Sequence, residues 1–546
     1  NKNEYKMLSY DFRLAATYNR EFNETHILNS YAGAEVNSQE RSSDWSEGWG
    51  MQYDNGELPF FDYLAFKRMR ERNTNYYGVS NTVNRQIAFF ATGTYSYKRR
   101  YTLTGTLRYE GSNRLGKARS ARWLPTWNVA AAWNMHEEEF FKKLQPAFSY
   151  LTLKASYSLT ADAGPTWVTN SRVVINSYNP WRPSAGVAES GLRISDLENS
   201  SLTYEKKHEL NIGVDMGFLD NRINLAADWY KRNNFDLIGW TSTQGAGGQV
   251  NRMGNVASMK SHGFEFTLST KNIKNKGFEW STDLIFGLSK TEVTELNTRS
   301  FMFALISGSG FTREGYPHRG LFSIPFVGLD EQGFPIFEIS DKNNEKVLVD
   351  KNNYGTLNFQ EMEHLDFLKY EGPTDPTITG SFGNIFSIKN WKLNVFVTYS
   401  AGNKVRLDPV FRSTYNDLDA TPKDFKNRWR VPGDEKRTNV PVISARRHHQ
   451  LYSNLNLGYN AYNYSTVRVA DGGFVRMKEI SLTYSLPGSL LEGKLLKSAS
   501  IKVQATNLFL IYSDKKLNGQ DPEFFRSGGV SAPVPKQFTC TLRLGF

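Results

Sequence analysis

The residues best suited to chemistry in this 546-residue chain are aromatic side chains in long segments between regular stretches. A flat indole or phenol face could stack on a sugar ring, while its polar end still forms hydrogen bonds. Six such residues are the candidate substrate-binding residues: Trp45, Trp49, Trp167, Tyr178, Trp181 and Trp240. The alternative interpretation is that these rings pack the segments together or mark the edge of a membrane-facing surface.

A second pattern has the spacing of a calcium-binding loop. Asp350, Asn352, Gly355 and Glu361 occupy positions 1, 3, 6 and 12 of an EF-hand-like series. Tyr354 stands at position 5, where a short side chain with an oxygen ligand is expected. The pattern therefore favours a turn rich in Asn and Gly over a calcium site, and we predict no metal site.

Enzymatic motifs are missing from the sequence. It contains no GxSxG, HExxH, Walker A or dinucleotide-binding fingerprint. His448 and His449 are adjacent, so an extended segment would point them to opposite faces, and a solvated basic loop over 446–449 is predicted. Glycosidase-type carboxylate pairs stay open, because Asp and Glu are abundant. We predict a protein that is not an enzyme and uses no cofactor.

Composition narrows the class further. Hydrophobic residues are 39% of the chain and mean hydropathy is −0.53. No run approaches the roughly 18 apolar residues of a membrane-spanning helix. The net charge of +11 is spread along the chain without a dense basic tract, so we expect no nucleic-acid partner. Attraction to lipopolysaccharide phosphates or to an anionic solute is equally consistent with that charge.

Alternating apolar and polar residues recur from end to end of the chain. This pattern predicts the strands that must position the candidate residues. In the final stretch, KQFTCTLRLGF, residues Phe538, Cys540, Leu542, Leu544 and Phe546 share one face of a strand. The other face carries polar residues and Gly, as suits a wall between lipid and water. A soluble sandwich would have strands of about 5–6 residues. These stretches are longer, which favours a membrane barrel.

The alternation predicts about fifteen strands, and their connections alternate between short and long. Short turns on one side and long loops on the other are typical of an outer-membrane barrel, with short turns periplasmic and long loops extracellular. Residues 136–146 are expected to form a helical or an irregular periplasmic turn. The predicted strands span 7–22, 25–40, 84–98, 101–113, 122–135, 150–160, 205–219, 221–236, 256–273, 277–294, 377–389, 391–403, 473–486, 498–512 and 536–546.

The strand count suggests a partial structure. With Phe546 on the short-turn side, an odd count places Asn1 on the extracellular side, whereas complete bacterial barrels have an even number of strands. The chain also starts without an initiator Met or signal peptide, which indicates a mature product or an internal fragment. We therefore predict an all-β, transmembrane antiparallel β-barrel domain over residues 1–546, partial, with further strands from upstream sequence or another polypeptide.

Eight segments in a fixed order resemble the carboxy-terminal barrel of the SusC/RagA family of TonB-dependent outer-membrane transporters of Bacteroidota. They cover nearly the whole chain and include RYEGSNRLG, WLPTWNVAAAW and DGGFVRMKEISLTYSLP. The family's signal peptide, TonB box, plug domain and first barrel strands have no counterpart here, so this chain would supply about fifteen of a probable twenty-two strands. The segments span 108–116, 123–133, 151–164, 199–238, 255–269, 427–435, 471–487 and 505–524.

The resemblance implies active import across the outer membrane. Implied partners are a SusD-like surface lipoprotein, the TonB–ExbB–ExbD motor acting through the missing amino-terminal part, and outer-membrane lipid. The expected substrate is an oligosaccharide. A peptide importer of the RagA type and a surface-binding barrel that does not transport are the alternatives.

Overall fold

The computed structural model divides into two compact units. Unit 1 comprises Asn1–Glu138, Lys154–Asn211 and Arg232–Ser258, and unit 2 comprises Glu139–Leu153, Ile212–Lys231 and Met259–Phe546. The residues that the structure describes are 2–48, 51–52, 58–59, 63–72, 74, 76–116, 118–145, 147–164, 173–178, 191–243, 245, 251–341, 343, 345–359, 364–410, 423–492, 495–524 and 534–546.

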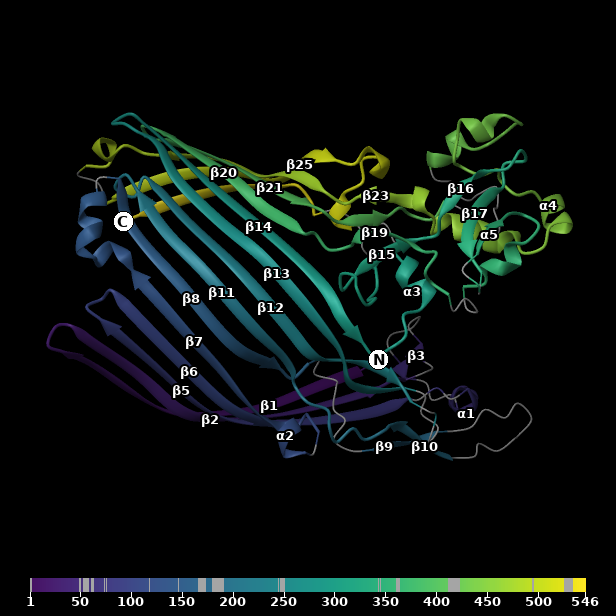
Figure 1. Ribbon diagram of the computed structural model, residues 1–546, viewed down its shortest axis with the longest axis horizontal. Helices are drawn as coiled ribbons and strands as arrows, with labels where there is room; N and C mark the ends of the chain where they lie inside the picture. The colour runs from purple at the N-terminus through teal and green to yellow at the C-terminus, as the bar shows by residue number, and fades with distance from the viewer. Residues whose placement is uncertain are drawn as a thin grey trace. The chain divides into compact units, whose positions relative to one another are not determined.

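The main element within these residues is a fifteen-stranded sheet whose strand order follows the sequence. Every predicted strand is present, which confirms the predicted antiparallel all-β architecture (Figure 1). The strands are β1 (Lys2–Phe22), β2 (His26–Ser46), β5 (Tyr77–Tyr97), β6 (Tyr101–Ser112), β7 (Trp123–Asn134), β8 (Phe148–Asp162), β11 (Glu205–Phe218), β12 (Ile223–Ser242), β13 (Asn251–Lys274), β14 (Phe278–Leu296), β20 (Ile378–Ile388), β21 (Trp391–Ala401), β24 (Phe474–Ser485), β25 (Ser498–Ser513) and β26 (Gln537–Gly545).

Three strands of unit 1 are longer than predicted. β1, β2 and β5 each have 21 residues, and their ladder runs without a register shift from Phe22↔His26 to Lys2↔Ser46. The sequence prediction ended these strands where alternation became weak. Strand pairing continues through the polar residues beyond the predicted ends, because backbone hydrogen bonds hold a strand ladder together and do not depend on the type of side chain.

Each unit has one apolar face that stays exposed. In unit 1 the side chains of Phe12, Leu14 and Leu107 are 67%, 68% and 54% exposed, although they lie in the middle of regular strands. In unit 2, Phe538 and Leu542 of the last strand are 74% and 64% exposed. A soluble sheet would bury these side chains in a protein core. Their exposure in a regular ladder fits a face that meets lipid.

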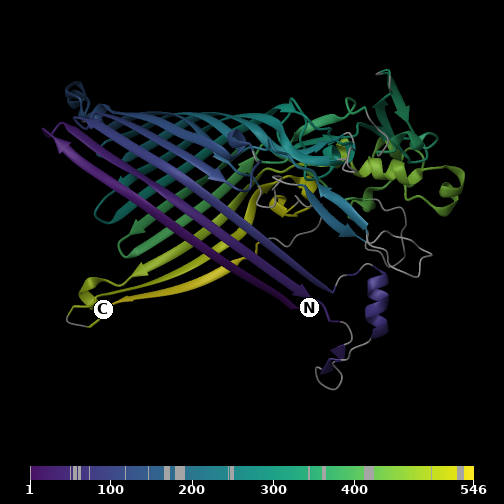
Figure 2. The same ribbon diagram turned by 90° about the horizontal axis from the view of Figure 1, so that it is seen from below.

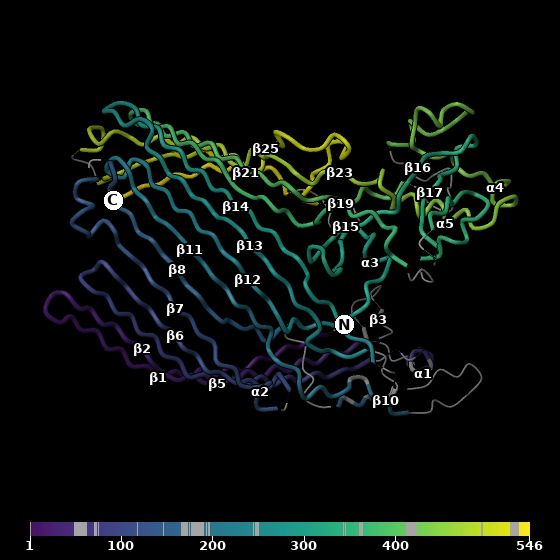
Figure 3. The backbone as a smooth tube through the Cα atoms, viewed as in Figure 1, coloured from purple at the N-terminus to yellow at the C-terminus, as the bar shows by residue number. Residues whose placement is uncertain are grey.

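The short turns gather at one end of each unit. In unit 1 the β1–β2 and β5–β6 turns lie together, opposite helix α1 (Tyr63–Glu71) (Figures 1 and 2). Two residues in each turn have a positive φ, Asn23 with Glu24 and Lys98 with Arg99, as tight hairpin turns require. In unit 2 the β20–β21 turn and the carboxy-terminal end of β26 lie opposite the long insertions (Figure 3).

The predicted helical turn between β7 and β8 is also found. It forms two 3-10 helices, η1 (Met135–Glu137) in unit 1 and η2 (Glu139–Leu144) in unit 2. In unit 1 the Glu138 carboxylate accepts hydrogen bonds from Tyr101 Oη at 2.6 Å and Arg100 Nη1 at 3.0 Å. The bond from Tyr101 is the main reason that the pKa of Glu138 lies below its usual range.

Two insertions of unit 2, after β14 and after β21, share a buried cluster that we call the loop core. Its largest fully buried side chains include Phe322, Phe334, Phe337, Tyr354 and Tyr462. The elements of these insertions are α3 (Met302–Ile306), β15 (Gly320–Ser323), β16 (Phe326–Leu329), β17 (Pro335–Ser340), β18 (Lys346–Val349), η4 (Tyr354–Leu357), β19 (Lys369–Pro373), β22 (Lys404–Arg406), η5 (Lys423–Asn427), η6 (Asp434–Lys436), α4 (Arg446–Leu451), α5 (Leu455–Asn463), η7 (Thr466–Arg468) and β23 (Val469–Asp471).

The remaining described elements are short. Within the described ranges, no helix is long and apolar enough to span a membrane. These elements are β3 (Met51–Gln52), β4 (Leu58–Pro59), α2 (Arg119–Arg122), β9 (Val174–Tyr178), β10 (Gly191–Asp196), η8 (Gly488–Leu490), η9 (Lys515–Leu517) and η10 (Pro522–Phe524).

Placing a charge on the exposed apolar face tests its contact with lipid. Leu107→Arg puts a guanidinium near the middle of β6, and we expect it to lower the free energy of unfolding in lipid vesicles by about 2–4 kcal/mol. Thr104→Arg is the control, since Thr104 lies on the opposite, polar face of the same strand. Denaturant titration of the full-length natural protein measures both. Equal losses in the two variants would contradict the assignment of the faces.

Candidate functional site

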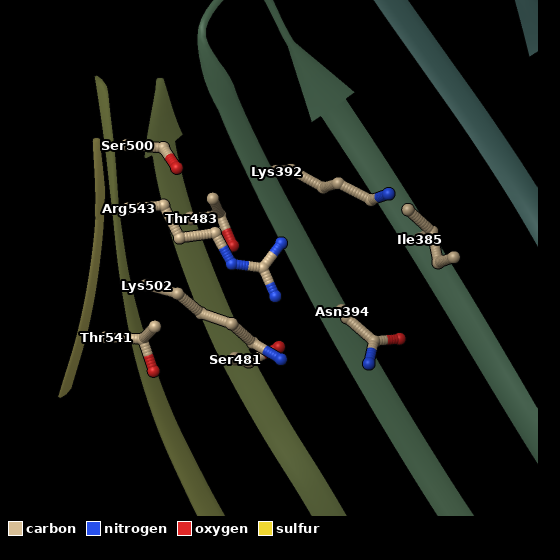
Figure 4. Close-up of a pocket in the computed structure, with 9 residues that line it drawn as sticks. All are labelled: Ile385, Lys392, Asn394, Ser481, Thr483, Ser500, Lys502, Thr541 and Arg543. Carbon is tan, nitrogen blue, oxygen red and sulfur yellow. The ribbon is translucent and has the colours of Figure 1, made fainter. Parts of the chain in front are cut away.

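The polar face of unit 2 contains a hollow of about 320 Å³ near the short-turn end of the sheet. Lys392 of β21, Lys502 of β25 and Arg543 of β26 extend into the same space (Figure 4). The ladder sets this arrangement, because Lys392 pairs with Thr483, which pairs with Lys502. Its lining residues are Ile385, Lys392, Asn394, Ser481, Thr483, Ser500, Lys502, Thr541 and Arg543.

One carboxylate lies beside the hollow. Glu479 of β24 accepts hydrogen bonds from Asn394 and Gln504 at 3.2 Å each, and forms a 3.5 Å ion pair with Lys502. The side chains of Lys392 and Arg543 form no hydrogen bond or ion pair with any residue that the structure describes. The lining is therefore rich in hydrogen-bond donors and has an excess of positive charge.

The polar face of unit 1 differs, because its cations are paired. Glu35 of β2 accepts a hydrogen bond from Arg108 Nη2 at 2.5 Å and lies 3.6 Å from Arg13 Nε. Arg108 also contacts Glu110 at 2.6 Å. The guanidinium of Arg13 lies 4.8 Å from the centre of the Phe90 ring. These contacts fix the long side chains against the strand surface.

A buried cation links the two insertions of the loop core. Arg406 is 6% exposed and donates to three backbone carbonyls, those of Ile306 at 3.2 Å, Ser465 at 2.9 Å and Phe322 at 2.5 Å. Burial lowers the pKa of Arg406 to about 9, so the guanidinium is still charged at neutral pH. The residue joins the two insertions, because Ile306 and Phe322 belong to the first and Arg406 and Ser465 to the second.

Of the six candidate aromatic residues, Trp45 is the best defined. It lies in β2 and not in a loop, because the strand extends to Ser46. The pairing Asn3↔Trp45↔Gly78 puts it on the same face as Glu35. Its indole covers Gly78, where a Cβ would overlap the ring. Trp45 is thus held on the polar face at the end of the strands opposite the short turns.

Two of the other candidates lie in described strands. Trp240 lies near the end of β12 and is 51% exposed. Tyr178 is the last residue of β9. Trp49, Trp167 and Trp181 lie outside the described residues. The six therefore remain candidate substrate-binding residues.

Sequence reasoning missed the residues of the hollow and an exposed aromatic group on the loop core. Phe301, the N-cap of α3, and Phe303, within α3, are 66% and 55% exposed, and Phe303 packs edge-on against Tyr464 at 5.7 Å. The exposed alternate residues in FMFALI were a usable signal, since Met302, Leu305 and Ile306 face the core. No local sequence pattern could indicate the hollow, because its cationic side chains come from three strands.

The calcium-like segment has another local role. Asp350 Oδ1 accepts a hydrogen bond from the Asn352 backbone N–H at 2.9 Å, as in an Asx turn. Tyr354 is buried in the loop core and its hydroxyl donates to the Pro335 carbonyl at 2.6 Å. The hydroxyl at position 5 is thus engaged within the loop core. Glu361 lies outside the described residues.

The paired histidines lie on a helix, not in an extended loop. His448 and His449 belong to α4, where His448 Nδ1 accepts from the Ala445 backbone N–H at 3.2 Å. The His448 ring packs edge-on against Phe334 at 5.2 Å, and His449 Nε2 is 3.0 Å from Ser444 Oγ. Partial burial lowers the pKa of His448. The short helix forms where the sequence prediction expected a loop, because His448 packs on the loop core.

Comparison with known proteins identifies the class. The chain matches the TonB dependent receptor-like β-barrel family over residues 2–469. It is 25% identical to TonB-dependent receptor P39 of Formosa agariphila over 96% of this chain and 51% of that protein. It is also 25% identical to TonB-dependent receptor SusC of Bacteroides thetaiotaomicron, over 87% of this chain and 44% of SusC.

A solved structure has the same fold. The structure of the RagAB peptide transporter superimposes with a TM-score of 0.79 at 22% identity, and the match covers all of this chain and 56% of the other. The chain thus spans about half the length of the relatives that it matches.

The sheet and the family match together define an outer-membrane β-barrel domain of the TonB-dependent receptor type. This chain belongs to the TonB-dependent receptor β-barrel family, and its SusC/RagA-like character, expected from the eight segments, is confirmed.

Arg406 provides a test of the loop core. Arg406→Met removes the guanidinium donor from three buried carbonyls, of which that of Ser465 keeps the Arg468 backbone N–H as a donor; each carbonyl left unpaired costs about 1–3 kcal/mol. We expect amide hydrogen exchange to accelerate in 302–306, 320–324 and 462–466, with an intermediate effect for Arg406→Lys. Arg437→Met, in an exposed position of the second insertion, is the matched control. Unchanged exchange in Arg406→Met would show that the guanidinium does not hold the insertions together.

Proposed function

We propose that this chain forms part of the membrane wall of an importer that takes up oligosaccharides across the outer membrane, driven by the TonB–ExbB–ExbD motor. The family match over residues 2–469 is the observation that carries the proposal. The two-faced sheet supports it, since one face is suited to lipid and the other to a wet passage. A SusD-like surface lipoprotein would be the partner that captures solute with the long insertions.

The wall is proposed to be completed by further strands. In the described sheet, β1 and β26 each have one neighbour, so each has one row of unpaired backbone groups. Each unsatisfied group in hydrocarbon costs several kcal/mol, so edges of this length need partners within a membrane. About seven more strands, with a plug and a TonB-contacting segment, would come from other sequence. The greater length of the relatives leaves room for them.

Two observations bear on the substrate. Trp45 on the polar face, with Phe301 and Phe303 on the loop core, offers ring surfaces of the kind that stack on sugars. The fold match to the RagAB peptide transporter supports the alternative, a peptide importer of the RagA type. We favour glycans as the substrate, because Trp45 lies in a regular strand and Phe301 and Phe303 lie on the packed loop core, with their rings exposed to solvent.

Energy coupling separates import from binding alone. We expect the full-length natural protein to take up its solute in cells, and a variant without its TonB-contacting segment to bind solute at the surface but import none. Uptake of labelled oligosaccharide and peptide mixtures measures both, with a protonophore-treated wild type as the control. Uptake that survives the deletion would contradict active coupling. Binding without uptake in the wild type would instead favour a surface-binding barrel.

Trp45 is the sharpest test of the substrate class. Trp45→Ala removes a ring from the polar face, and we expect glycan binding to weaken about tenfold, corresponding to about 1.4 kcal/mol. Trp45→Phe should retain most of it. Trp391→Ala is the matched control, since Trp391 packs against Tyr484 on the apolar face. Titration calorimetry in detergent gives the affinities. Weaker peptide binding with intact glycan binding would favour the peptide alternative.

A further inference from the structure

Polar side chains interrupt the apolar face of unit 2 near its short turns. Thr282 of β14 pairs with Asn384 of β20. Toward the turn, the next pair on the same side of these strands is Trp280↔Phe386, and beyond it lies the exposed Ile388. Because residues two apart in a strand point to the same face, Thr282 and Asn384 share the apolar face. The polar pair therefore points toward lipid and away from the passage.

Hydrogen bonds join these side chains to two polar residues of β13. Asn384 Oδ1 accepts from Trp280 Nε1 at 2.9 Å and from Thr282 Oγ1 at 2.8 Å. Asn272 Nδ2 donates to Thr282 Oγ1 at 2.7 Å, and Thr270 Oγ1 donates to Asn272 Oδ1 at 2.8 Å. We call these five residues the lipid-face network. An indole N–H can only donate, so the amide oxygen of Asn384 faces Trp280 and its amide N–H groups point elsewhere.

Neither a complete barrel nor a plug would cover the lipid-face network. β14 pairs with β20 and β20 pairs with β21, so these strands lie within the sheet, whereas further strands would join at β1 and β26. A plug would fill the passage, which lies on the opposite face of the same strands. Polar groups that meet only acyl chains cost free energy, so the remaining donors of the network need the polar part of a lipid beside them.

The depth of the network fits the headgroup layer. Asn384 lies four residues before Ile388, the last residue of β20. With a rise of about 3.3 Å per residue and a tilt of about 45°, this length corresponds to about 9 Å of depth. The polar layer on each side of a bilayer is roughly 5–8 Å thick, so Asn384 lies where headgroups meet acyl chains. Trp391 and Tyr484, 4.6 Å apart at the same end of this face, are aromatic residues of the type found at that boundary.

Three exposed lysines lie between the network and the water. Lys274, the last residue of β13, is two residues beyond Asn272 and so lies on the same face. Lys276 is in the β13–β14 turn and Lys389 in the β20–β21 turn. The two turns are in contact, because the Lys389 backbone N–H donates to the Gly277 carbonyl at 3.3 Å. A lysine can lay its methylene stem along acyl chains and place its ammonium in the headgroup layer.

The acidic side chains of this part of β14 lie on the opposite face. Glu279 and Asp283 alternate with the network residues of the strand, so they face the passage. There Asp283 accepts a hydrogen bond from Ser269 Oγ at 2.6 Å. The lipid side of these two turns therefore has an excess of positive charge, which favours a headgroup with a net negative charge over a zwitterionic one.

We propose that this surface binds the headgroup of an anionic phospholipid in the periplasmic leaflet. The lysine ammonium groups contact the phosphate, and the amide N–H groups of the network contact the glycerol and ester oxygens. The acyl chains lie along the apolar face further from the turns, past the exposed Phe382. The inference rests on the outer-membrane location of the barrel and not on what the protein transports.

Lipid binding to the purified full-length natural protein tests this surface. Phosphatidylglycerol and phosphatidylethanolamine are titrated into the protein in detergent, and bound lipid is measured by native mass spectrometry. We expect the wild type to bind phosphatidylglycerol about fivefold more tightly than phosphatidylethanolamine. Lys274→Gln/Lys389→Gln should weaken phosphatidylglycerol binding about tenfold, because two charge-assisted contacts are lost. Equal affinity in this variant and the wild type overturns the proposal.

Asn384→Asp tests the network separately from the lysines. The carboxylate can accept the same two hydrogen bonds from Trp280 and Thr282, but it places a negative charge beside the lipid phosphate. We expect phosphatidylglycerol binding to weaken about tenfold, with an unchanged melting temperature of the protein without lipid. Unchanged affinity for phosphatidylglycerol would contradict contact between the network and the headgroup.

Two lysines on the passage side provide the matched control. Lys271→Gln/Lys392→Gln removes exposed cations of β13 and β21 from the opposite face at the same end of the sheet, and it should bind phosphatidylglycerol as the wild type does. Equal losses in the two double variants would overturn the site, because total charge alone would then decide binding. Dimerisation of the wild type that is lost in Lys274→Gln/Lys389→Gln, without lipid binding, would also overturn it, since a second copy would then cover this face. Absence of solute uptake in cells would overturn the import function and leave the lipid site standing.

Discussion

Backbone hydrogen bonding in a medium without water is the constraint on which this structure depends. A strand in hydrocarbon must pair its N–H and C=O groups with its neighbours, because no solvent can satisfy them. β2 meets this demand over its 21 residues, because it pairs with β1 on one side and with β5 on the other, without a register shift. Once the ladder is fixed, side chains alternate between two faces, and the division between lipid and passage follows from the period of two.

The regular strand register also determines which charged side chains meet on the polar face. A side chain on a strand can reach only its cross-strand and diagonal neighbours, so charge pairing is decided by register. In unit 1 the register brings Arg108 to Glu35, and the charges balance locally. In unit 2 it places Lys392 and Lys502 in one row with Thr483 between them. The polar faces of the two units thus follow the same strand geometry but present different charges to a solute.

Strand number, order and faces could be predicted from the sequence because each rests on local periodicity. Strand ends were less predictable, as Trp45 shows, since pairing of β2 continues to Ser46 where the alternation gives no signal. The hollow on the polar face of unit 2 was not predicted. Lys392 lies 110 residues before Lys502 and 151 residues before Arg543 in sequence, and no spacing rule relates the three until the strand pairing is known.

The long insertions were expected to be loops, yet they share a core that periodicity could not reveal. Residues of the loop core come from two segments separated by β20 and β21, so neither segment alone contains all of its packing partners. Arg406 joins them through three carbonyls at a buried position. A binding residue on such a core keeps its place without a ligand, which lowers the ordering cost of recognition. Phe301 and Phe303 satisfy that condition, because the intervening Met302 is anchored in the core. Their exposed rings therefore have a rigid support.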